Sequence, residues 1–192
     1  TRLFCIPHGL VYRDRLLCFT PQGSKAVVQY DPQADRMVRV WGTGQDFTHL
    51  LYLHSNNKEF YTTNVESGTV SLFNWKQLPP YMPPTGVLPP GAKAREDWVQ
   101  TIVPAGIGVE GFDVSEPNHE LWTARPDGKI MIIDLQQQKV KDSIDTKVEG
   151  LHRLKITPDG KTVCIVSVKT GTLLYYDRSS RKQTGSSLIG QG

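Results

Sequence analysis

The chain has 192 residues, of which 38% are hydrophobic and 21% are charged, and its formal net charge is +3. This composition is typical of a soluble globular protein. No apolar run approaches the ~18 residues that a membrane helix needs, so no membrane span is expected. Basic and acidic residues are interspersed without a basic stripe, and for that reason nucleic-acid binding is not expected.

Neither the start of the chain nor its cysteines define a cellular compartment. No signal peptide is visible, and the chain begins with Thr1 rather than Met, which is consistent with removal of a leader or of more of the protein. Cys18 and Cys164 stand at equivalent second-strand positions and are expected to be buried and free, whereas Cys5 lies near the start, where it can be exposed. An odd cysteine count without a CxxC motif predicts no disulfide framework and no zinc site.

Four copies of one pattern occupy nearly the whole chain. Each copy is an alternating strand, a turn, a second strand, a further turn and a third strand that ends at Asp or Asn. These end residues are Asp31, Asn74, Asp134 and Asp177, and they lie 43, 60 and 43 residues apart. A period of about 40–45 residues with several strands per unit is typical of a β-propeller. We therefore predict an all-β fold, a β-propeller with four four-stranded blades in one region, residues 1–192.

The predicted blades cover about residues 5–42, 45–104, 106–146 and 148–190. The second blade is longer because of an insertion at residues 78–97, which begins with the six prolines of LPPYMPPTGVLPPG and continues with charged residues. Proline removes donors from a strand ladder, so we expect the insertion to be a surface loop. A fourth strand should resume after it, at residues 98–103.

The two later blades have the clearest turns. RPDG at residues 125–128 and TPDG at residues 157–160 combine a proline that presets φ with a glycine that tolerates positive φ. The Asp that ends each third strand is expected to cap the following turn through backbone N–H groups. Runs such as VCIVSV and IMIID are apolar on both faces, as expected of strands that lie between neighbouring blades.

These two blades carry a family resemblance. The segments EGFDVS, ELWTARPDGKIMIIDL and LHRLKITPDGKTVCIVSVKTGTLLYYD, within residues 106–182, resemble the YVTN-type β-propeller repeat and, more distantly, the lactonase-type seven-bladed propellers. The first two blades match more loosely, because YRDR at residues 12–15 and SNNK at residues 55–58 replace the usual Pro-Asp-Gly turn. The resemblance implies a propeller fold and favours a surface-layer-like, exported or periplasmic protein.

The number of blades leaves the closure of the ring open. Members of this family usually have seven blades, whereas the repeat occurs four times in this chain. An open ring leaves apolar blade faces exposed. Three interpretations follow: a segment of a longer propeller, which we favour; a compact four-bladed ring; or two copies that self-associate to close a larger ring.

One residue near the start of each innermost strand is a candidate for function. His8, His49, Glu110 and His152 precede the Asp or Asn that ends the third strand by 23, 25, 24 and 25 residues. Because innermost strands face a common channel, we expect these side chains to converge at one channel mouth. Imidazole and carboxylate groups bind metals and anions, which predicts a small-molecule site or a divalent metal there. The alternative is that these residues only bond to backbone at the channel rim.

The insertion in blade 2 is the second candidate. Trp75 and Trp98 flank it, and Tyr81 lies in its proline-rich part. A proline-rich segment can dock on an aromatic-lined groove, so we regard these residues as a candidate partner-binding loop. The alternative is a plain exposed loop beside tryptophans that only pack between blades.

The sequence indicates no enzyme class, because no GxSxG, P-loop, Rossmann glycine, CxxCH or HExxH motif occurs. The first hypothesis is a non-enzymatic propeller scaffold that binds a protein, a glycan or a small ligand at the channel face and through the blade-2 loop. The second is a lactonase-like hydrolase with a metal or an acid–base group at the channel mouth, which rests on fold resemblance alone. A third is an electron-transfer accessory that needs haem or copper, for which no haem-attachment motif is present.

Overall fold

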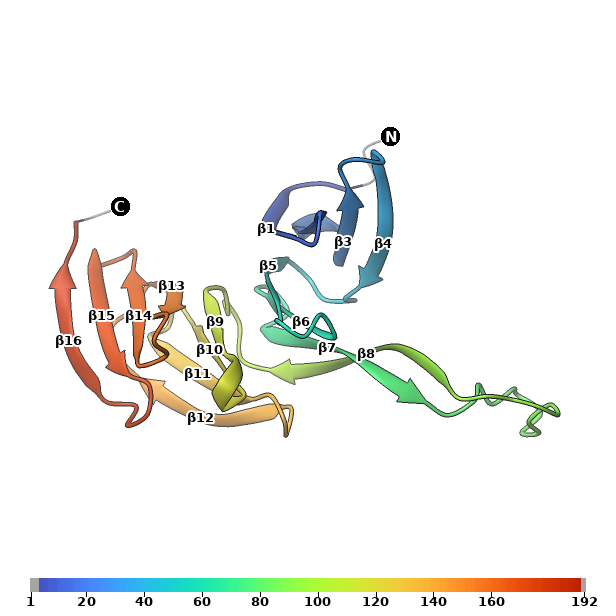
Figure 1. Ribbon diagram of the computed structural model, residues 1–192. Helices are drawn as coiled ribbons and strands as arrows, with labels where there is room; N and C mark the ends of the chain where they lie inside the picture. The colour runs from blue at the N-terminus through green and yellow to red at the C-terminus, as the bar shows by residue number, and fades with distance from the viewer. Residues whose placement is uncertain (1–3, 191–192) are drawn as a thin grey trace.

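The computed structural model describes residues 4–190, which form sixteen strands in four antiparallel four-stranded sheets (Figure 1). In each sheet the strand order follows the chain, and we call the sheets blades 1 to 4. The strands are β1 (Pro7–Arg13), β2 (Leu16–Pro21), β3 (Ala26–Asp31) and β4 (Arg36–Gly42) in blade 1; β5 (Thr48–Leu53), β6 (Glu59–Asn64), β7 (Thr69–Leu78) and β8 (Arg95–Pro104) in blade 2; β9 (Phe112–Ser115), β10 (Glu120–Ala124), β11 (Lys129–Asp134) and β12 (Lys139–Asp145) in blade 3; and β13 (Leu151–Ile156), β14 (Thr162–Ser167), β15 (Thr172–Asp177) and β16 (Gln183–Leu188) in blade 4. Two short 3₁₀ helices, η1 (Gln22–Ser24) and η2 (Glu116–Asn118), follow β2 and β9. Residues 4–190 contain no helix with the length and hydrophobicity of a membrane span.

The four blades lie side by side around a common centre, which confirms the predicted all-β propeller. Their first strands contact one another in chain order, β1 with β5, β5 with β9 and β9 with β13. The blades form an arc that is open between blade 1 and blade 4 (Figure 1). The outer faces of these two end blades are therefore the faces that no neighbouring blade covers.

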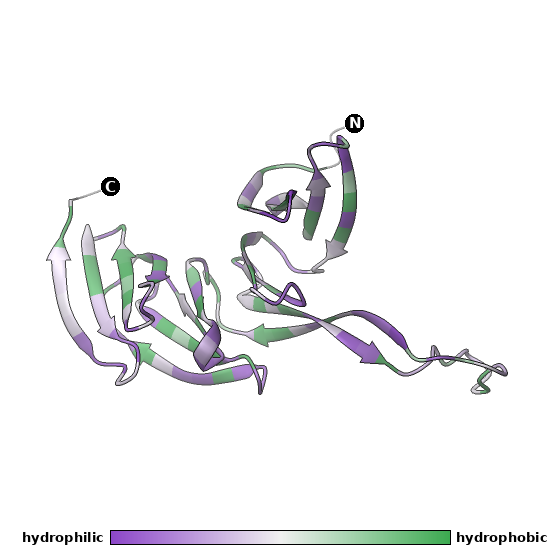
Figure 2. Cartoon of the chain, viewed as in Figure 1, coloured by the Kyte–Doolittle hydropathy of each residue, from purple (hydrophilic) through white to green (hydrophobic). Residues whose placement is uncertain are grey.

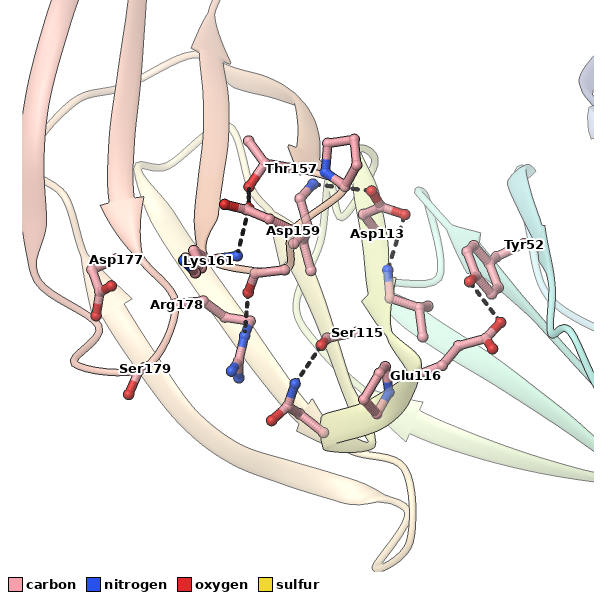
Figure 3. Close-up of a pocket in the computed structure, with 16 residues that line it drawn as sticks. Tyr52, Asp113, Ser115, Glu116, Thr157, Asp159, Lys161, Asp177, Arg178 and Ser179 are labelled. Carbon is pink, nitrogen blue, oxygen red and sulfur yellow. Dashed lines mark hydrogen bonds between the residues drawn. The ribbon is translucent and has the colours of Figure 1, made fainter.

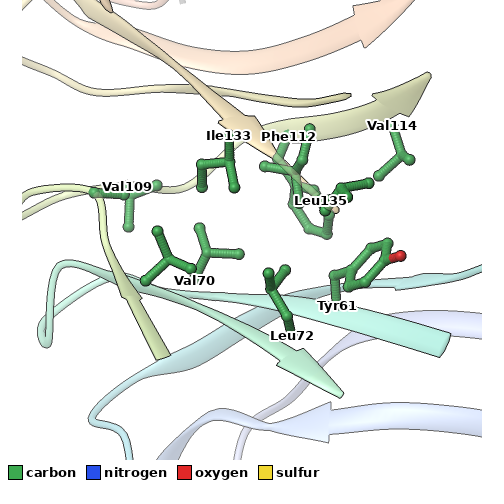
Figure 4. Packing of buried hydrophobic residues seen from close by; sticks show 11 residues of the cluster. Tyr61, Val70, Leu72, Val109, Phe112, Val114, Ile133 and Leu135 are labelled. Atoms are coloured by element: carbon green, nitrogen blue, oxygen red, sulfur yellow. The ribbon is translucent and has the colours of Figure 1, made fainter. Parts of the chain in front are cut away.

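The blades are held together by apolar side chains from both faces of each sheet. Hydrophobic and polar residues alternate along the strands (Figure 2), so that one strand supplies both faces. Between blades 2 and 3, Tyr61 and Leu72 pack against Phe112, Val114 and Ile133 (Figure 4). Similar clusters join blade 1 to blade 2 and blade 3 to blade 4. Full burial of one such side chain stabilises the fold by about 1.5–3 kcal/mol. The seams between blades are therefore the hydrophobic core of this molecule.

The predicted turn caps are confirmed. Asp31 accepts hydrogen bonds from the backbone N–H groups of Gln33 and Ala34, and Asp134 accepts the equivalent pair from Gln136 and Gln137. In blade 4 the equivalent aspartate accepts from the backbone N–H three residues on, at 2.7 Å. The repeating Asp therefore orders the turn between the third and fourth strands of these blades.

The insertion in blade 2 differs from the predicted loop. The strands β7 and β8 continue their pairing outward as far as Leu78 and Arg95, so that a two-stranded ribbon projects away from the blade (Figure 1). The fourth strand thus begins at Arg95 rather than at residue 98, and the loop proper is limited to residues 79–94. The cross-strand pair of Trp75 and Trp98, with ring centroids 5.6 Å apart, supports the ribbon where it leaves the blade. We call residues 75–98 the arm.

How deeply each cysteine is buried depends on the face of the sheet that its side chain occupies. Cys18 points into the seam between blades 1 and 2 and is buried, as predicted. Cys164 is only half-buried, because its neighbours Val163 and Ile165 take the face toward blade 3 and leave it on the outer face of blade 4. Cys5 is exposed.

A buried carboxylate links blades 3 and 4 near their outer turns. Glu120 is 6% exposed, and its oxygens lie 3.0 Å from Arg178 Nη1, 3.2 Å from Lys141 Nζ and 3.5 Å from Arg181 Nη2. Burial by itself would raise the pKa of Glu120, but hydrogen bonds from Trp122, Lys141 and Arg178 outweigh it and lower the pKa. Glu120 is therefore ionised at neutral pH and neutralises two arginines that belong to the next blade.

We predict that Glu120→Gln lowers the free energy of unfolding by about 3 kcal/mol, because it leaves the charges of Arg178 and Arg181 without their partner. The pKa of Glu120 is lower in the folded protein than in the unfolded chain, where it is about 4.3. The stabilisation by ionised Glu120 should therefore be present at pH values above about 4.3 and should be lost as pH falls through the pKa of the folded state. Urea denaturation at neutral and at acid pH measures both effects. As a control, Asp145→Asn removes an exposed ion pair with Lys147 and should leave the unfolding free energy unchanged. Equal losses in the two variants would contradict the prediction.

Candidate functional site

The structure brings all four predicted channel-mouth residues together. The rings of His8 and His49 stack with centroids 3.8 Å apart at an interplanar angle of 25°. His49 Nε2 and His152 Nε2 each lie 2.9 Å from the same oxygen, Oε1 of Glu110. Blades 2, 3 and 4 are thus linked through one carboxylate oxygen, and blade 1 joins them through the stacked rings.

Sequence reasoning missed three members of this group. Arg153 Nη1 lies 3.4 Å from Glu110 Oε1, Gln22 Nε2 contacts His49 Nδ1, and the ring of Phe47 stacks on His49 at 5.7 Å. Successive side chains of a regular strand point to opposite faces, so Arg153 would be expected to point away from the site when His152 points toward it. The pairing of β13 with β14 shifts register between Leu151 and Leu154, and a shift of this kind re-aims side chains, so that two consecutive residues approach Glu110. We call His8, His49, Glu110, His152 and Arg153 the channel-mouth cluster.

Buried hydroxyl groups hold the backbone of the cluster in place. Thr20 Oγ1, at the end of β2, donates to the carbonyl of His49 and accepts from Gly9 N at 2.8 Å. Thr63 Oγ1, at the equivalent position of β6, donates to the carbonyl of Glu110 at 2.9 Å. In each case a hydroxyl of one blade fixes a site residue of the next blade, which positions the side chains independently of their own contacts.

The glycine after Glu110 is required by close approach of two first strands. Gly111 N donates to the carbonyl oxygen of His152 at 2.9 Å, and a Cβ on Gly111 would lie only 2.0 Å from that oxygen. Gly9, which follows His8, meets the carbonyl of His49 in the same way, at 2.6 Å. Glycine at these positions therefore lets the openings of neighbouring first strands come within contact distance.

The cluster is deepest at His49 and opens toward Arg153. The side chain of His49 is 7% exposed and that of Glu110 17%, whereas those of His152 and Arg153 are 34% and 43% exposed. Burial would raise the pKa of Glu110, but the hydrogen bond from His49 and the charges of His152 and Arg153 lower it, so the carboxylate is ionised at neutral pH. Partial burial, followed by the neighbouring His49 and Arg153, lowers the pKa of His8.

These residues do not fit the divalent metal that the sequence suggested. Both ring nitrogens of His49 are engaged, Nδ1 by the Gln22 amide and Nε2 by the Glu110 carboxylate, so the single lone pair of a neutral imidazole is not free for a metal. His8 stacks on the ring of His49. Among residues 4–190, no group of three or more His, Cys, Asp or Glu side chains has the arrangement of a metal site.

The candidate partner-binding residues lie on the arm, away from the channel mouth. Trp75 and Trp98 face each other at its base, where Trp98 also packs on Trp41 at 5.6 Å and on Phe60 at 5.0 Å. Tyr81 lies in the loop at the tip and is 70% exposed. The structure therefore brings the two tryptophans together and separates them from the tyrosine.

A cavity of about 640 Å³ lies at the opposite end of the first strands, between the turns of blades 3 and 4 (Figure 3). The sequence did not predict this cavity. Acidic side chains, several of them from turns, line it. Glu116 accepts from Tyr52 Oη at 2.8 Å, Asp113 from the backbone N of Ile156 at 3.0 Å, and Asp159 from the backbone N of Lys161 at 3.0 Å. Since these carboxylates already satisfy groups of the protein, we assign them to turn and seam stability.

Comparisons with known proteins identify the fold. Models of protein families gave no match, and no curated protein matched. Among solved structures, the chain is similar to Kuenenia stuttgartiensis hydrazine synthase, with a TM-score of 0.75 and 17% sequence identity over 95% of this chain. The match covers 49% of that chain, so the protein spans about half the length of the structure that it resembles. At this identity the likeness shows the β-propeller fold alone.

We predict that His8 titrates below its ordinary pKa of 6.5 and that its two charged neighbours move this pKa in opposite directions. Glu110→Gln should lower the pKa of His8 further, because a stabilising negative charge is lost, and Arg153→Met should raise it. NMR titration of the His8 ring protons measures all three values. Lys169→Met, at a distant turn, should change none of them. A wild-type pKa at or above 6.5 would contradict the prediction that burial and the neighbouring basic side chains lower this pKa.

Proposed function

We propose that the protein is a non-enzymatic β-propeller scaffold that binds a small anionic ligand at the channel mouth and a protein partner through the arm. We further propose that it belongs with the YVTN-type propellers, on the strength of the repeat in residues 106–182. The observation that carries the ligand proposal is the composition of the channel-mouth cluster. Two imidazoles and one guanidinium lie around a single carboxylate and a third imidazole stacks on one of them, so four basic side chains gather with one acidic one.

Arg153 is the residue best placed to receive an anion. A guanidinium has five donors in a planar fork that matches a carboxylate or a phosphate. The side chain of Arg153 is 43% exposed, while its buried Nη1 lies 3.4 Å from Glu110 Oε1 and has no hydrogen-bond partner among the described residues. The half-exposed His152 stands beside it. An anion at this opening would gain charge-assisted hydrogen bonds from both side chains.

The alternative is a lactonase-like hydrolase in which His8, His49, Glu110 and His152 hold a metal or act as acid and base. The engagement of both His49 nitrogens disfavours the metal version. The sharing of one Glu110 oxygen among three basic groups disfavours a free general base, because that oxygen is already neutralised. The scaffold therefore accounts better for the geometry of the cluster.

We also propose that the four blades are part of a larger ring. Leu10, Tyr12 and Val40 on the outer face of blade 1 are 64%, 65% and 48% exposed, although the equivalent faces of blades 2 to 4 are covered by a preceding blade. Covering such a face with another blade would bury this apolar surface. The match to about half of a longer propeller chain supports the same proposal.

The anion and metal proposals predict opposite effects of one substitution. Glu110→Gln should tighten binding of succinate or inorganic phosphate, because it removes the carboxylate that competes for the basic groups, whereas at a metal site it would weaken binding of Zn²⁺. Arg153→Met should weaken anion binding about tenfold or more. Anion affinity should also rise as pH falls through the lowered pKa of His8, since His8 then gains a positive charge.

Isothermal titration calorimetry with succinate, phosphate and Zn²⁺ measures these effects. Lys155→Met serves as the matched control, because Lys155 lies on the same strand but pairs with Asp113 near its other end. Weaker anion binding in Glu110→Gln, or stoichiometric Zn²⁺ binding that this variant abolishes, would overturn the scaffold proposal in favour of the hydrolase.

A further inference from the structure

The tip of the arm is an exposed apolar segment without charge. Residues 78–92 contain six prolines and no Asp, Glu, Lys or Arg. Tyr81, Met82 and Val87 are 70%, 53% and 70% exposed there. Two turns interrupt the tip, closed by hydrogen bonds from Gly86 N to the Pro83 carbonyl at 2.9 Å and from Ala92 N to the Pro89 carbonyl at 3.1 Å. Outside these turns the paired prolines favour the polyproline II conformation, whose backbone carbonyls are unpaired acceptors. The tip is therefore an exposed, uncharged segment that can lose its water at little electrostatic cost.

The base of the arm carries a cleft of the kind that accepts such segments. Three hollows, of about 570, 340 and 180 Å³, meet at Trp98 in the seam between blades 1 and 2. Trp41 and Trp75 line two of them each, and Arg39 stands over the Trp41 ring at 5.5 Å. We call this region the tryptophan cleft. Aromatic-lined grooves are the usual docking sites of polyproline II segments.

Two donors in the cleft wall lack acceptors. The indole nitrogens of Trp41 and Trp98 are buried, and neither has a hydrogen-bond partner among the described residues. Buried tryptophan N–H groups normally find a partner. Backbone carbonyls of a polyproline II segment are acceptors of the missing type, which a segment docked against these two rings would supply.

The geometry directs the tip of one molecule to the cleft of another. The arm leads away from its own cleft as a two-stranded ribbon, so its tip points outward from its own blade (Figure 1). When two arms of equal length lie antiparallel, each tip reaches the base of the other arm, which is where the cleft lies. The two contacts are then identical, as a two-fold symmetric dimer requires.

We propose that the protein forms a dimer in which the proline-rich tip of each arm docks in the tryptophan cleft of a second copy. This inference rests on the proposed role of the arm in partner binding and names the partner as the chain itself. It is independent of the channel-mouth cluster, whose residues lie on the first strands.

Sedimentation velocity over about a hundredfold range of protein concentration tests the dimer. Tyr81→Ser and Trp75→Ala should each raise the dissociation constant about tenfold or more, as expected when an interface anchor is removed. Tyr12→Ser is the matched control, because Tyr12 is a similarly exposed tyrosine, at 65%, on the outer face of blade 1. It should leave the dimer unchanged. Loss of association in Tyr12→Ser but not in Tyr81→Ser would assign the contact to the end blade and overturn the proposal.

A synthetic peptide of residues 77–92 separates docking from folding effects. The peptide should change the tryptophan fluorescence of the protein and should compete with dimer formation, whereas a peptide with Tyr81→Ser should bind about tenfold or more weakly. A monomeric protein that does not bind the peptide would overturn the inference. Anion titrations of the same samples keep the proposals distinct, since Tyr81→Ser should leave succinate binding at the channel mouth unchanged.

Discussion

The two inner blades of this propeller are apolar on both faces, and the rest of the arrangement depends on that constraint. In blade 3, Leu121 and Ile133 pack toward blade 2, whereas Trp122 and Ile132 on the opposite face pack toward blade 4, and all four are fully buried. A sheet of this kind cannot face water on either side without losing about 1.5–3 kcal/mol for each such side chain. The blades are therefore stable only side by side, and stacking twisted sheets in this way brings their first strands around a common axis.

The crowding of the first strands explains why a site forms at their openings. Where neighbouring backbones touch, as at Gly111 and His152, a side chain fits only at the rim, where it meets the openings of the next blades. One residue from each blade is then enough to build a composite cluster. Only one member, Glu110, is acidic, and its charge is shared among three partners. The excess of basic over acidic side chains therefore follows from blade geometry and from the identities of the five residues at these openings.

The architecture could be predicted from the sequence because its signals are local. The caps of Asp31 and Asp134 need only the next few backbone N–H groups, and the repeat spacing follows from the strand and turn lengths. The convergence of His8 and Glu110 could be predicted by counting equivalent positions. Arg153 could not, since a register shift depends on pairing with another strand. Propensity also failed for the arm, where Arg95 pairs with Leu78 although prolines follow within the loop.

Two exposed apolar surfaces among the described residues, the outer face of blade 1 and the tip of the arm, differ in their physical chemistry. The outer face of blade 1 is a pleated sheet surface whose neighbours within the sheet are already paired, so the surface that complements it is another sheet face, as at the internal seams. The tip of the arm has no sheet at all, and its prolines cannot donate to a ladder, so it cannot add a strand to an exposed edge. A groove lined by aromatic rings is the kind of surface that accepts exposed proline rings. The proposed growth of the ring and the proposed association through the arm would therefore use different physical chemistry, and neither would block the other.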